Sequence, residues 1–245
     1  MTAGSCKRKS GPVEAPAPGH PRQAARVAEK TPEKIGAYEF RQAGQRLTQD
    51  SVLLADFVLP LKKEDIVLDL GAGSGVMPLI FCLKSEAGKI VGVEINEKAA
   101  KSARENISVN CLAERVEIMN RDWRTLKGIF PGGSFSVIVS NPPYVKKGSG
   151  RISPSSERAL ARHESAGTLR DLIEISEYLL SKKGRLFYVY PVRRLQELFS
   201  ELKRFGMKPV RISFVHAEKG LDADVFLIEA GFGGELRVEG SVFRK

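Results

Sequence analysis

An apolar run that ends in closely spaced glycines is the feature of this chain that most restricts its fold. Residues 66–70 read Ile-Val-Leu-Asp-Leu, which suits a strand buried in a parallel sheet. Gly71, Gly73 and Gly75 follow directly and lead into a helical pattern over residues 75–85. Glycine permits positive φ and close approach of a ligand to the backbone, and the helix N-terminus offers free N–H groups. The stretch therefore predicts a strand–turn–helix unit with a ligand site at its turn.

Apolar runs and helical patterns alternate along the rest of the chain. A short hairpin is expected from residues 38–41 and 45–48, followed by a helix over 51–59 with Asp50 as its N-cap or in its first turn. We expect further strands at 66–70, 89–95, 115–119, 134–140, 185–190, 209–215 and 224–230, and helices at 75–85, 97–110, 168–181 and 192–205. This alternation predicts an α/β fold with a seven-stranded, mostly parallel sheet, helices on both faces and an antiparallel last strand.

The N-terminal segment differs in composition from the rest of the chain. Residues 1–34 are rich in proline, alanine, glycine and basic side chains and contain scarcely any large apolar ones. Such a segment buries too little surface to offset its chain entropy, so we expect a disordered basic tail. Residues 35–245 are expected to form one domain, in which residues 35–60 supply a hairpin and a helix over the cofactor pocket.

Acidic side chains end successive predicted strands, where ligands of open α/β sheets bind. Asp69 stands two residues before Gly71, Glu94 ends the second strand, and Asp122 with Trp123 follows the third. An acid at position 69 would repel a pyrophosphate but suits a ligand with an ammonium and a sulfonium, which favours S-adenosyl-methionine over a dinucleotide. Glu94 would accept hydrogen bonds from both ribose hydroxyls, and Asp122 would accept one from the adenine amino group. Trp123 would pack beside the adenine ring.

The fourth predicted strand, residues 134–140, delivers the tetrapeptide Asn141-Pro142-Pro143-Tyr144. The prolines make the loop rigid and remove two backbone donors, so the Asn141 side-chain oxygen and the Pro142 carbonyl remain as acceptors. Two acceptors fit a planar amino group and would orient its nitrogen toward the cofactor methyl. Tyr144 can lie against the flat face of a base or amide. Together with the glycine turn, the tetrapeptide predicts methyl transfer to an amide or base nitrogen.

Charge points to a polyanionic partner, most simply nucleic acid, because the formal net charge is +10. The basic cluster expected to border the substrate entrance follows the tetrapeptide and consists of Lys146, Lys147, Arg151, Arg158 and Arg162. The three cysteines are far apart, which excludes a disulfide framework and a cysteine zinc site on spacing. We expect a monomeric cytoplasmic protein with no metal and no membrane span.

The two motifs together resemble those of the class I amino-methyltransferases, which act on exocyclic amines or glutamine amides. The segment Arg46-Leu47-Thr48-Gln49-Asp50-Ser51 and the triplet Arg162-His163-Glu164 are similar to signatures of the YfiC-like branch. The resemblance implies a Rossmann-like fold and methylation of adenine N6 beside the anticodon of a valine tRNA. It implies that Asn141, Pro142 and Tyr144 hold the target base. It also implies that Asp50, Asp69, Gly71, Gly73, Glu94 and Asp122 hold or enclose S-adenosyl-methionine. We expect Gly75, Trp123 and Asn141 to border the same cofactor pocket.

Three other readings share part of this pattern. A protein glutamine-N5 methyltransferase of the HemK-like kind uses the same tetrapeptide but usually carries a helical N-terminal domain, for which residues 1–34 are too short and polar. A guanine-N2 rRNA methyltransferase often has a duplicated domain, which this sequence lacks. The non-enzyme alternative is an RNA-binding module without catalytic activity, which would bind RNA but not S-adenosyl-methionine.

Overall fold

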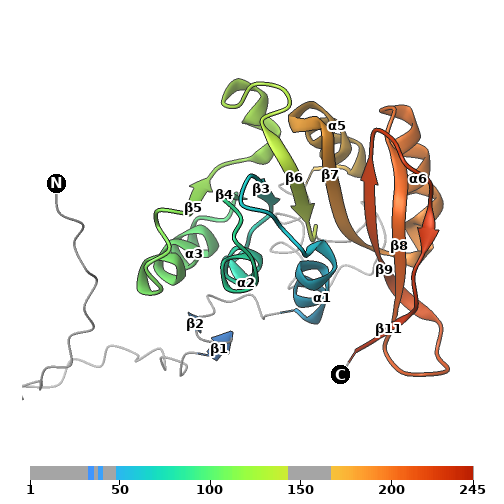
Figure 1. Cartoon of the computed structure of the whole chain (residues 1–245), viewed down its shortest axis with the longest axis horizontal. Helices are drawn as coiled ribbons and strands as arrows, with labels where there is room; N and C mark the ends of the chain where they lie inside the picture. The colour runs from blue at the N-terminus through green and yellow to red at the C-terminus, as the bar shows by residue number, and fades with distance from the viewer. Residues whose placement is uncertain (1–32, 36–37, 41–47, 143–166, 245) are drawn as a thin grey trace, which may run out of the picture.

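A nine-stranded mixed sheet forms the centre of the fold in the computed structural model, which describes residues 33–35, 38–40, 48–142 and 167–244 (Figure 1). Its strand order is β10-β8-β9-β7-β6-β3-β4-β5, with β11 also paired to β8. The strands are β3 (Ile66–Leu70), β4 (Lys89–Glu94), β5 (Val116–Asn120), β6 (Phe135–Ser140), β7 (Leu180–Pro191), β8 (Lys208–His216), β9 (Ala223–Gly231), β10 (Arg237–Val238) and β11 (Val242–Phe243). Strand β9 is antiparallel to both β7 and β8, and the other pairs are parallel.

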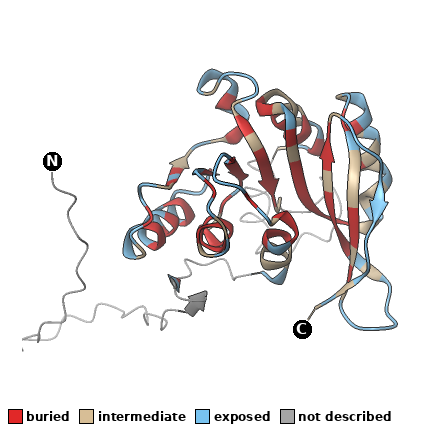
Figure 2. Cartoon of the chain, in the orientation of Figure 1, coloured by how far each residue is buried: buried red, intermediate tan, exposed pale blue. Residues whose placement is uncertain are grey.

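Helices cover both faces of this sheet and divide the core into two layers (Figures 1 and 2). One layer buries the apolar faces of α1 (Gln49–Val58), α2 (Val76–Lys84) and α3 (Glu97–Val109). The other buries those of α5 (Leu169–Leu179) and α6 (Leu195–Arg204), with the short helices η1 (Trp123–Gly128) and η2 (Val192–Arg194) beside them. Among the described residues, the helices are too short or too polar to cross a membrane.

Side-chain hydrogen bonds cap the N-termini of α1, α3 and α5. Asn96 caps α3 by accepting a hydrogen bond from the Ala99 N–H, as the sequence predicted. Thr168 and Asp171 form a reciprocal capping box at the start of α5. Thr48, rather than Asp50, caps α1, so Asp50 lies in its first turn. The predicted α/β fold with its seven main strands and antiparallel last strand is confirmed.

The described residues include a hairpin that the sequence did not predict, on the N-terminal side of the expected one. Strand β1 (Glu33–Ile35) pairs with β2 (Tyr38–Phe40), whereas the sequence suggested pairing of 38–41 with 45–48, of which 41–47 lie outside the described residues. Asn110 fastens the hairpin to the end of α3, because its side chain bonds both the N–H and the carbonyl of Glu39. Phe40 is buried in the core layer of α1, α2 and α3.

Three elements at the C-terminal half depart from expectation. Strand β7 begins at Leu180, directly after α5, because Phe135 of β6 pairs with Leu180 before a register shift brings Val137 opposite Arg185. Strands β10 and β11 were not predicted, since two residues each are too few to show an alternating pattern. Both pair with β8 and extend the sheet beyond its expected edge.

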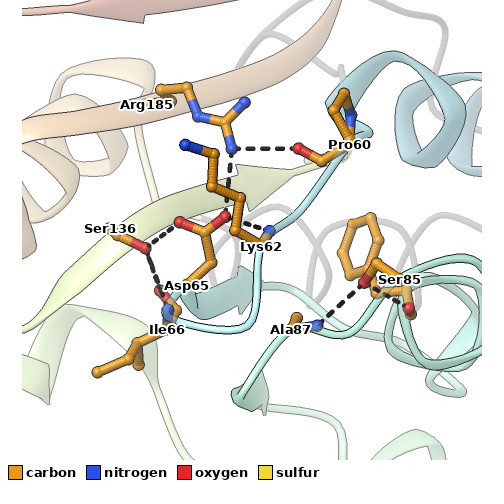
Figure 3. Close-up of polar contacts among 9 residues, drawn as sticks. Pro60, Lys62, Asp65, Ile66, Ser85, Ala87, Ser136 and Arg185 are labelled. Carbon is orange, nitrogen blue, oxygen red and sulfur yellow. Dashed lines mark hydrogen bonds and ion pairs between the residues drawn. The ribbon is translucent and has the colours of Figure 1, made fainter.

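Asp65 joins the starts of several strands at the amino edge of the sheet (Figure 3). Its carboxylate accepts hydrogen bonds from the Ser136 hydroxyl at 2.7 Å and the Lys62 N–H at 2.8 Å, and it pairs with Arg185 at 3.5 Å. The Ser136 oxygen in turn accepts from the Ile66 N–H at 3.0 Å. One largely buried carboxylate thus ties β3 to β6 and β7 before the strands run toward the opposite edge.

Replacing Asp65 with alanine is expected to lower the free energy of unfolding by about 2 kcal/mol, because three partly buried donors lose an acceptor that is itself largely buried. Urea denaturation followed by circular dichroism measures this change. The matched control is Asp56→Ala, which removes an ion pair with Lys84 between half-exposed side chains. That pair is worth less than about 1 kcal/mol. Equal losses in the two variants would show that Asp65 does not organise the strand starts.

Candidate active site

The glycine turn between β3 and α2 has the backbone geometry that its sequence predicted. Gly71, Gly73 and Gly75 adopt φ values of 85°, 56° and 84°, in the left-handed region where other residues are strained. A Cβ atom at Gly75 would approach the Cβ of Ala103 in α3 to 3.2 Å, so this glycine also allows close helix packing. At Gly71 a Cβ atom would meet no atom of the described residues within 4 Å, so open space adjoins the turn in that part of the chain.

Two buried polar side chains hold the turn in place. The Glu94 carboxylate accepts hydrogen bonds from the Gly73 N–H at 2.9 Å and the Asn96 N–H at 2.8 Å. Asn106 of α3 is fully buried and donates to the Ser74 carbonyl at 2.9 Å. Sequence reasoning missed Asn106, although a polar residue on the alanine-rich face of α3 was a usable signal. Glu94 therefore shapes the turn, and its contact with a ribose stays a prediction.

Asp69 is a buried carboxylate without a compensating partner. It is completely inaccessible to solvent, and neither oxygen has a hydrogen-bond partner within the described part of the chain. Burial raises the pKa of the Asp69 carboxyl well above its ordinary value, and the charge of Glu94 raises it further. An unpaired buried acid is costly in free energy. Two acids beside a glycine turn fit a cationic group, so the residues present suit the ammonium and sulfonium of S-adenosyl-methionine.

The sheet register brings Asn141 to this turn. Asp69 of β3 pairs directly with Val139 of β6. Asn141 comes directly after the last residue of β6, two positions beyond Val139, so an extended chain directs it to the same face of the sheet as Asp69. The Ser140 hydroxyl donates to the Leu70 carbonyl at 2.6 Å in a buried contact, which ties the ends of the two strands together. The two motifs that are 70 residues apart in sequence thus meet at the same edge.

The N-terminus of α1 meets Asn141 from the helical layer. The Asn141 side-chain nitrogen lies 2.9 Å from the Ser51 hydroxyl oxygen and 3.3 Å from that of Thr48. Asp50, predicted to enclose the cofactor pocket, bonds to Arg244 at 2.9 Å through one carboxylate oxygen. The contacts with Asn141 bring the first turn of α1 to the carboxyl edge. Contact between Asp50 and a cofactor stays a prediction.

Asp122 and Trp123 follow β5 at the same edge but have other partners within the protein. Burial alone would raise the pKa of Asp122, yet hydrogen bonds and the charge from Arg124 outweigh it and hold the pKa below its ordinary value. The contact between the Arg124 Nε and Asp122 Oδ1 is 2.9 Å long. Trp123 is buried in the layer of α5, and a Cβ atom on Gly167 would fall 2.7 Å from its ring. The adenine contacts of both residues stay predictions.

Several predicted site residues lie outside the described residues. They are Pro143, Tyr144, Lys146, Lys147, Arg151, Arg158 and Arg162. Of the tetrapeptide, the structure therefore describes Asn141 and Pro142, both half-buried. Among the residues that it describes, histidine, cysteine, aspartate and glutamate form no group able to hold a metal ion.

Solved structures with the same fold are methyltransferases. A "predicted O-methyltransferase" from Agrobacterium tumefaciens aligns with a TM-score of 0.62 and 20% identity, over 80% of this chain and 87% of that one. The TYW2 protein of M. jannaschii, solved in complex with AdoMet, aligns with a TM-score of 0.56 and 15% identity, over 82% and 84% of the two chains. At these identities the likeness shows the class I Rossmann-like fold.

Sequence comparison identifies the enzyme class. The tRNA1(Val) (adenine(37)-N6)-methyltransferase of Aeromonas hydrophila is 30% identical over 193 residues, 78% of this chain and 79% of the relative. The Tolumonas auensis protein of the same name is 28% identical over 76% of both chains. Residues 43–205 match the methyltransferase small domain family. The expectation of a methyltransferase that uses S-adenosyl-methionine is confirmed. This chain belongs to the methyltransferase small domain family.

Proposed function

We propose that this protein methylates the N6 amine of an adenine in a tRNA anticodon loop, with position 37 of a valine tRNA as the first substrate to test. The observation that carries the proposal is the meeting of Asn141 with the glycine turn at the ends of β3 and β6. The substrate comes from the relatives, which are named as tRNA1(Val) (adenine(37)-N6)-methyltransferases. We place the reaction in the cytoplasm, where tRNA is modified.

On the cofactor side, the acids and the glycine turn make a cation-binding bed. S-adenosyl-methionine supplies a methyl group on a positively charged sulfur. Asp69 and Glu94 provide negative charge beside the turn, in surroundings where burial strengthens electrostatic attraction. The open space at Gly71 lets a ligand reach the backbone. We assign Asp69, Gly71, Gly73, Gly75 and Glu94 to cofactor binding on these grounds.

On the substrate side, Asn141 and Pro142 supply acceptors for a planar amine. Their oxygens would hold the two N6 hydrogens, aim the nitrogen lone pair at the methyl carbon, and favour the positive charge that develops on nitrogen during attack. The amine can release its extra proton afterwards, so a strong base is not needed. Tyr144 is assigned to stacking against the adenine, because a base acted on by an enzyme must leave its stack.

Binding of RNA is assigned to the basic cluster Lys146, Lys147, Arg151, Arg158 and Arg162, which follows the tetrapeptide in sequence. Lysine and arginine side chains neutralise phosphates and release counterions, which makes affinity fall with salt. An anticodon loop is an accessible substrate, since its bases are splayed out at low cost.

Incubation with isotope-labelled S-adenosyl-methionine tests the proposal. A transcript of valine tRNA with adenine at position 37 is expected to yield N6-methyladenosine by mass spectrometry of its nucleosides, and the same transcript with guanine at position 37 is expected to yield none. Total rRNA and a glutamine-containing protein fraction are included in parallel. Label in guanine N2 or in a glutamine amide would overturn the proposal in favour of those substrate classes.

Asp69→Asn is expected to weaken S-adenosyl-methionine binding at least about tenfold, because asparagine cannot ionise when the cation binds and so cannot supply the opposite charge. It also changes how stability depends on pH. The folded pKa of Asp69 lies above its unfolded value, so its contribution to stability is full below the unfolded pKa and is lost as pH rises through the folded pKa. Urea denaturation of the cofactor-free protein between about pH 5 and pH 9 is therefore expected to show wild type losing stability relative to the variant as pH rises.

The control for this pH series is Asp56→Asn, which neutralises a half-exposed carboxylate on α1. Its profile is expected to run parallel to that of wild type in the alkaline part of the range. If Asp69→Asn also ran parallel there, the Asp69 carboxyl would be ionised without cost in the folded protein.

Asn141→Ala is expected to lower kcat by about 100-fold while the Kd for S-adenosyl-methionine changes less than about threefold, because the main role assigned to Asn141 is acceptance from the amine and the other cofactor-binding residues remain. Single-turnover methylation and equilibrium binding give the two quantities. An equal loss in both would contradict the assigned role of Asn141.

A further inference from the structure

Two hydroxyls from the first turn of α1 hold the side chain of Asn141. Its nitrogen donates to the Ser51 oxygen at 2.9 Å and to the Thr48 oxygen at 3.3 Å. The two hydroxyl oxygens are themselves hydrogen-bonded at 2.9 Å. Thr48 also caps α1 by accepting from the Ser51 N–H at 3.3 Å. These residues are 90 or more positions from Asn141 in sequence, so the contact is made by the fold.

Holding the nitrogen of a carboxamide also fixes its oxygen. The terminal torsion of asparagine is broad, so an unheld side chain samples several orientations and can exchange its nitrogen and oxygen positions. When the hydroxyls engage the NH2 group, the oxygen must point to the other side of the planar amide. Donation from the nitrogen also polarises the amide and makes its oxygen a better acceptor.

The helix that carries these hydroxyls is itself anchored to the C-terminal half of the domain. Asp50, between Thr48 and Ser51, bonds to Arg244, which also pairs with Asp224 at the start of β9. At the other end of α1, the Arg211 guanidinium of β8 donates to the Phe57 carbonyl at 2.7 Å and stacks over its ring. A helix tied at both ends presents its hydroxyls to β6 from a fixed position.

We propose that Ser51, with Thr48, is a positioning residue of the methyl-transfer site: it selects the orientation of the Asn141 carboxamide in which the oxygen accepts from the target amine. The proposal rests on the proposed role of Asn141. Neither hydroxyl contacts the reacting atoms; both act through Asn141. Ser51 makes the shorter contact and is not the N-cap, so it can be altered with less effect on the helix than Thr48, whose loss would cost about 1 kcal/mol of stability.

Ser51→Ala is the central variant, and Ser51→Thr, which keeps a hydroxyl, is its rescue. We expect Ser51→Ala to lower kcat about tenfold, with the KM for tRNA and the Kd for S-adenosyl-methionine within about twofold of wild type. Ser51→Thr is expected to recover most of the lost kcat. The matched control is Ser200→Ala on α6, whose hydroxyl bonds only the Gln196 carbonyl within its own helix among the contacts that the structure gives. Equal kcat losses in the Ser51→Ala and Ser200→Ala proteins would overturn the proposal.

A double-mutant cycle separates positioning from a general effect on the site. If Ser51 acts through Asn141, Ser51→Ala in the Asn141→Ala background is expected to cause no further loss of single-turnover rate. A further loss of the same size as in wild type would show that Ser51 acts independently of Asn141 and would overturn the proposal.

Nuclear magnetic resonance tests the contact without using activity. Protein labelled with ¹⁵N at asparagine, with the Asn141 side-chain signal assigned by its loss in Asn141→Ala, is compared with the Ser51→Ala protein. A hydrogen-bonded NH2 group is expected to shift and to exchange faster with solvent when the hydroxyl is removed. Unchanged signals would overturn the positioning role. If wild type methylated no tRNA adenine but these signals changed, the proposed substrate would fail while the contact stood.

Discussion

Parallel pairing between β3 and β6 is the interaction on which the site depends. It sets Asp69 opposite Val139, and the Ser140 hydroxyl then clamps the Leu70 carbonyl where the strands end. A slip of one residue would turn Asn141 to the other face of the sheet, away from α1. At the opposite edge, Asp65 bonds Ser136 of β6 and pairs with Arg185 of β7, so the register is fixed where the strands begin as well as where they end. The distance between two motifs 70 residues apart is thus controlled by contacts that are remote from the chemistry.

The cofactor side of the site is built at a cost to the stability of the empty protein. Asp69 is buried without a hydrogen-bond partner in the described chain, and Glu94 lies close enough to disfavour its charge further. A buried hydrophobic side chain of similar size would be more stable there. The glycines add to the cost, since each loses more backbone freedom on folding than any other residue would. The free energy of binding a cationic cofactor can offset both costs. Functional sites are the places where proteins depart from optimal stability.

Much of this fold was predictable because its signals are local. Apolar runs such as Ile66–Leu70 and Phe135–Ser140 mark buried parallel strands, and caps such as Asn96 mark helix starts. Strand β1 was missed because residues 33 and 34 were assigned to the basic tail on composition, and the contact that fastens β2 to α3 comes from the distant Asn110. The early start of β7 was missed because Lys182, Lys183 and Gly184 lack the alternation of a strand.

The site shows the same division between local and distant information. The glycine turn, the strand-end acids and the tetrapeptide are read from consecutive residues. The partner that a side chain takes can depend on residues far away in sequence: Trp123 packs against α5 in the core layer. Asn106 and Ser51 are single polar residues within helices, and only the packed structure brings them to Ser74 and Asn141.

Helix α1 links the amine side of the site to the C-terminal half of the chain. Its first turn holds Asn141 through Ser51, while Arg244 grips Asp50 in the same turn and Arg211 holds the far end at Phe57. Arg211 lies in β8, and Arg244 directly follows β11. Strands β10 and β11 both pair with β8. The two short strands that the sequence did not predict therefore pair with the strand that carries Arg211 and lie just before Arg244, so the position of α1 beside Asn141 depends on contacts from the C-terminal part of the domain.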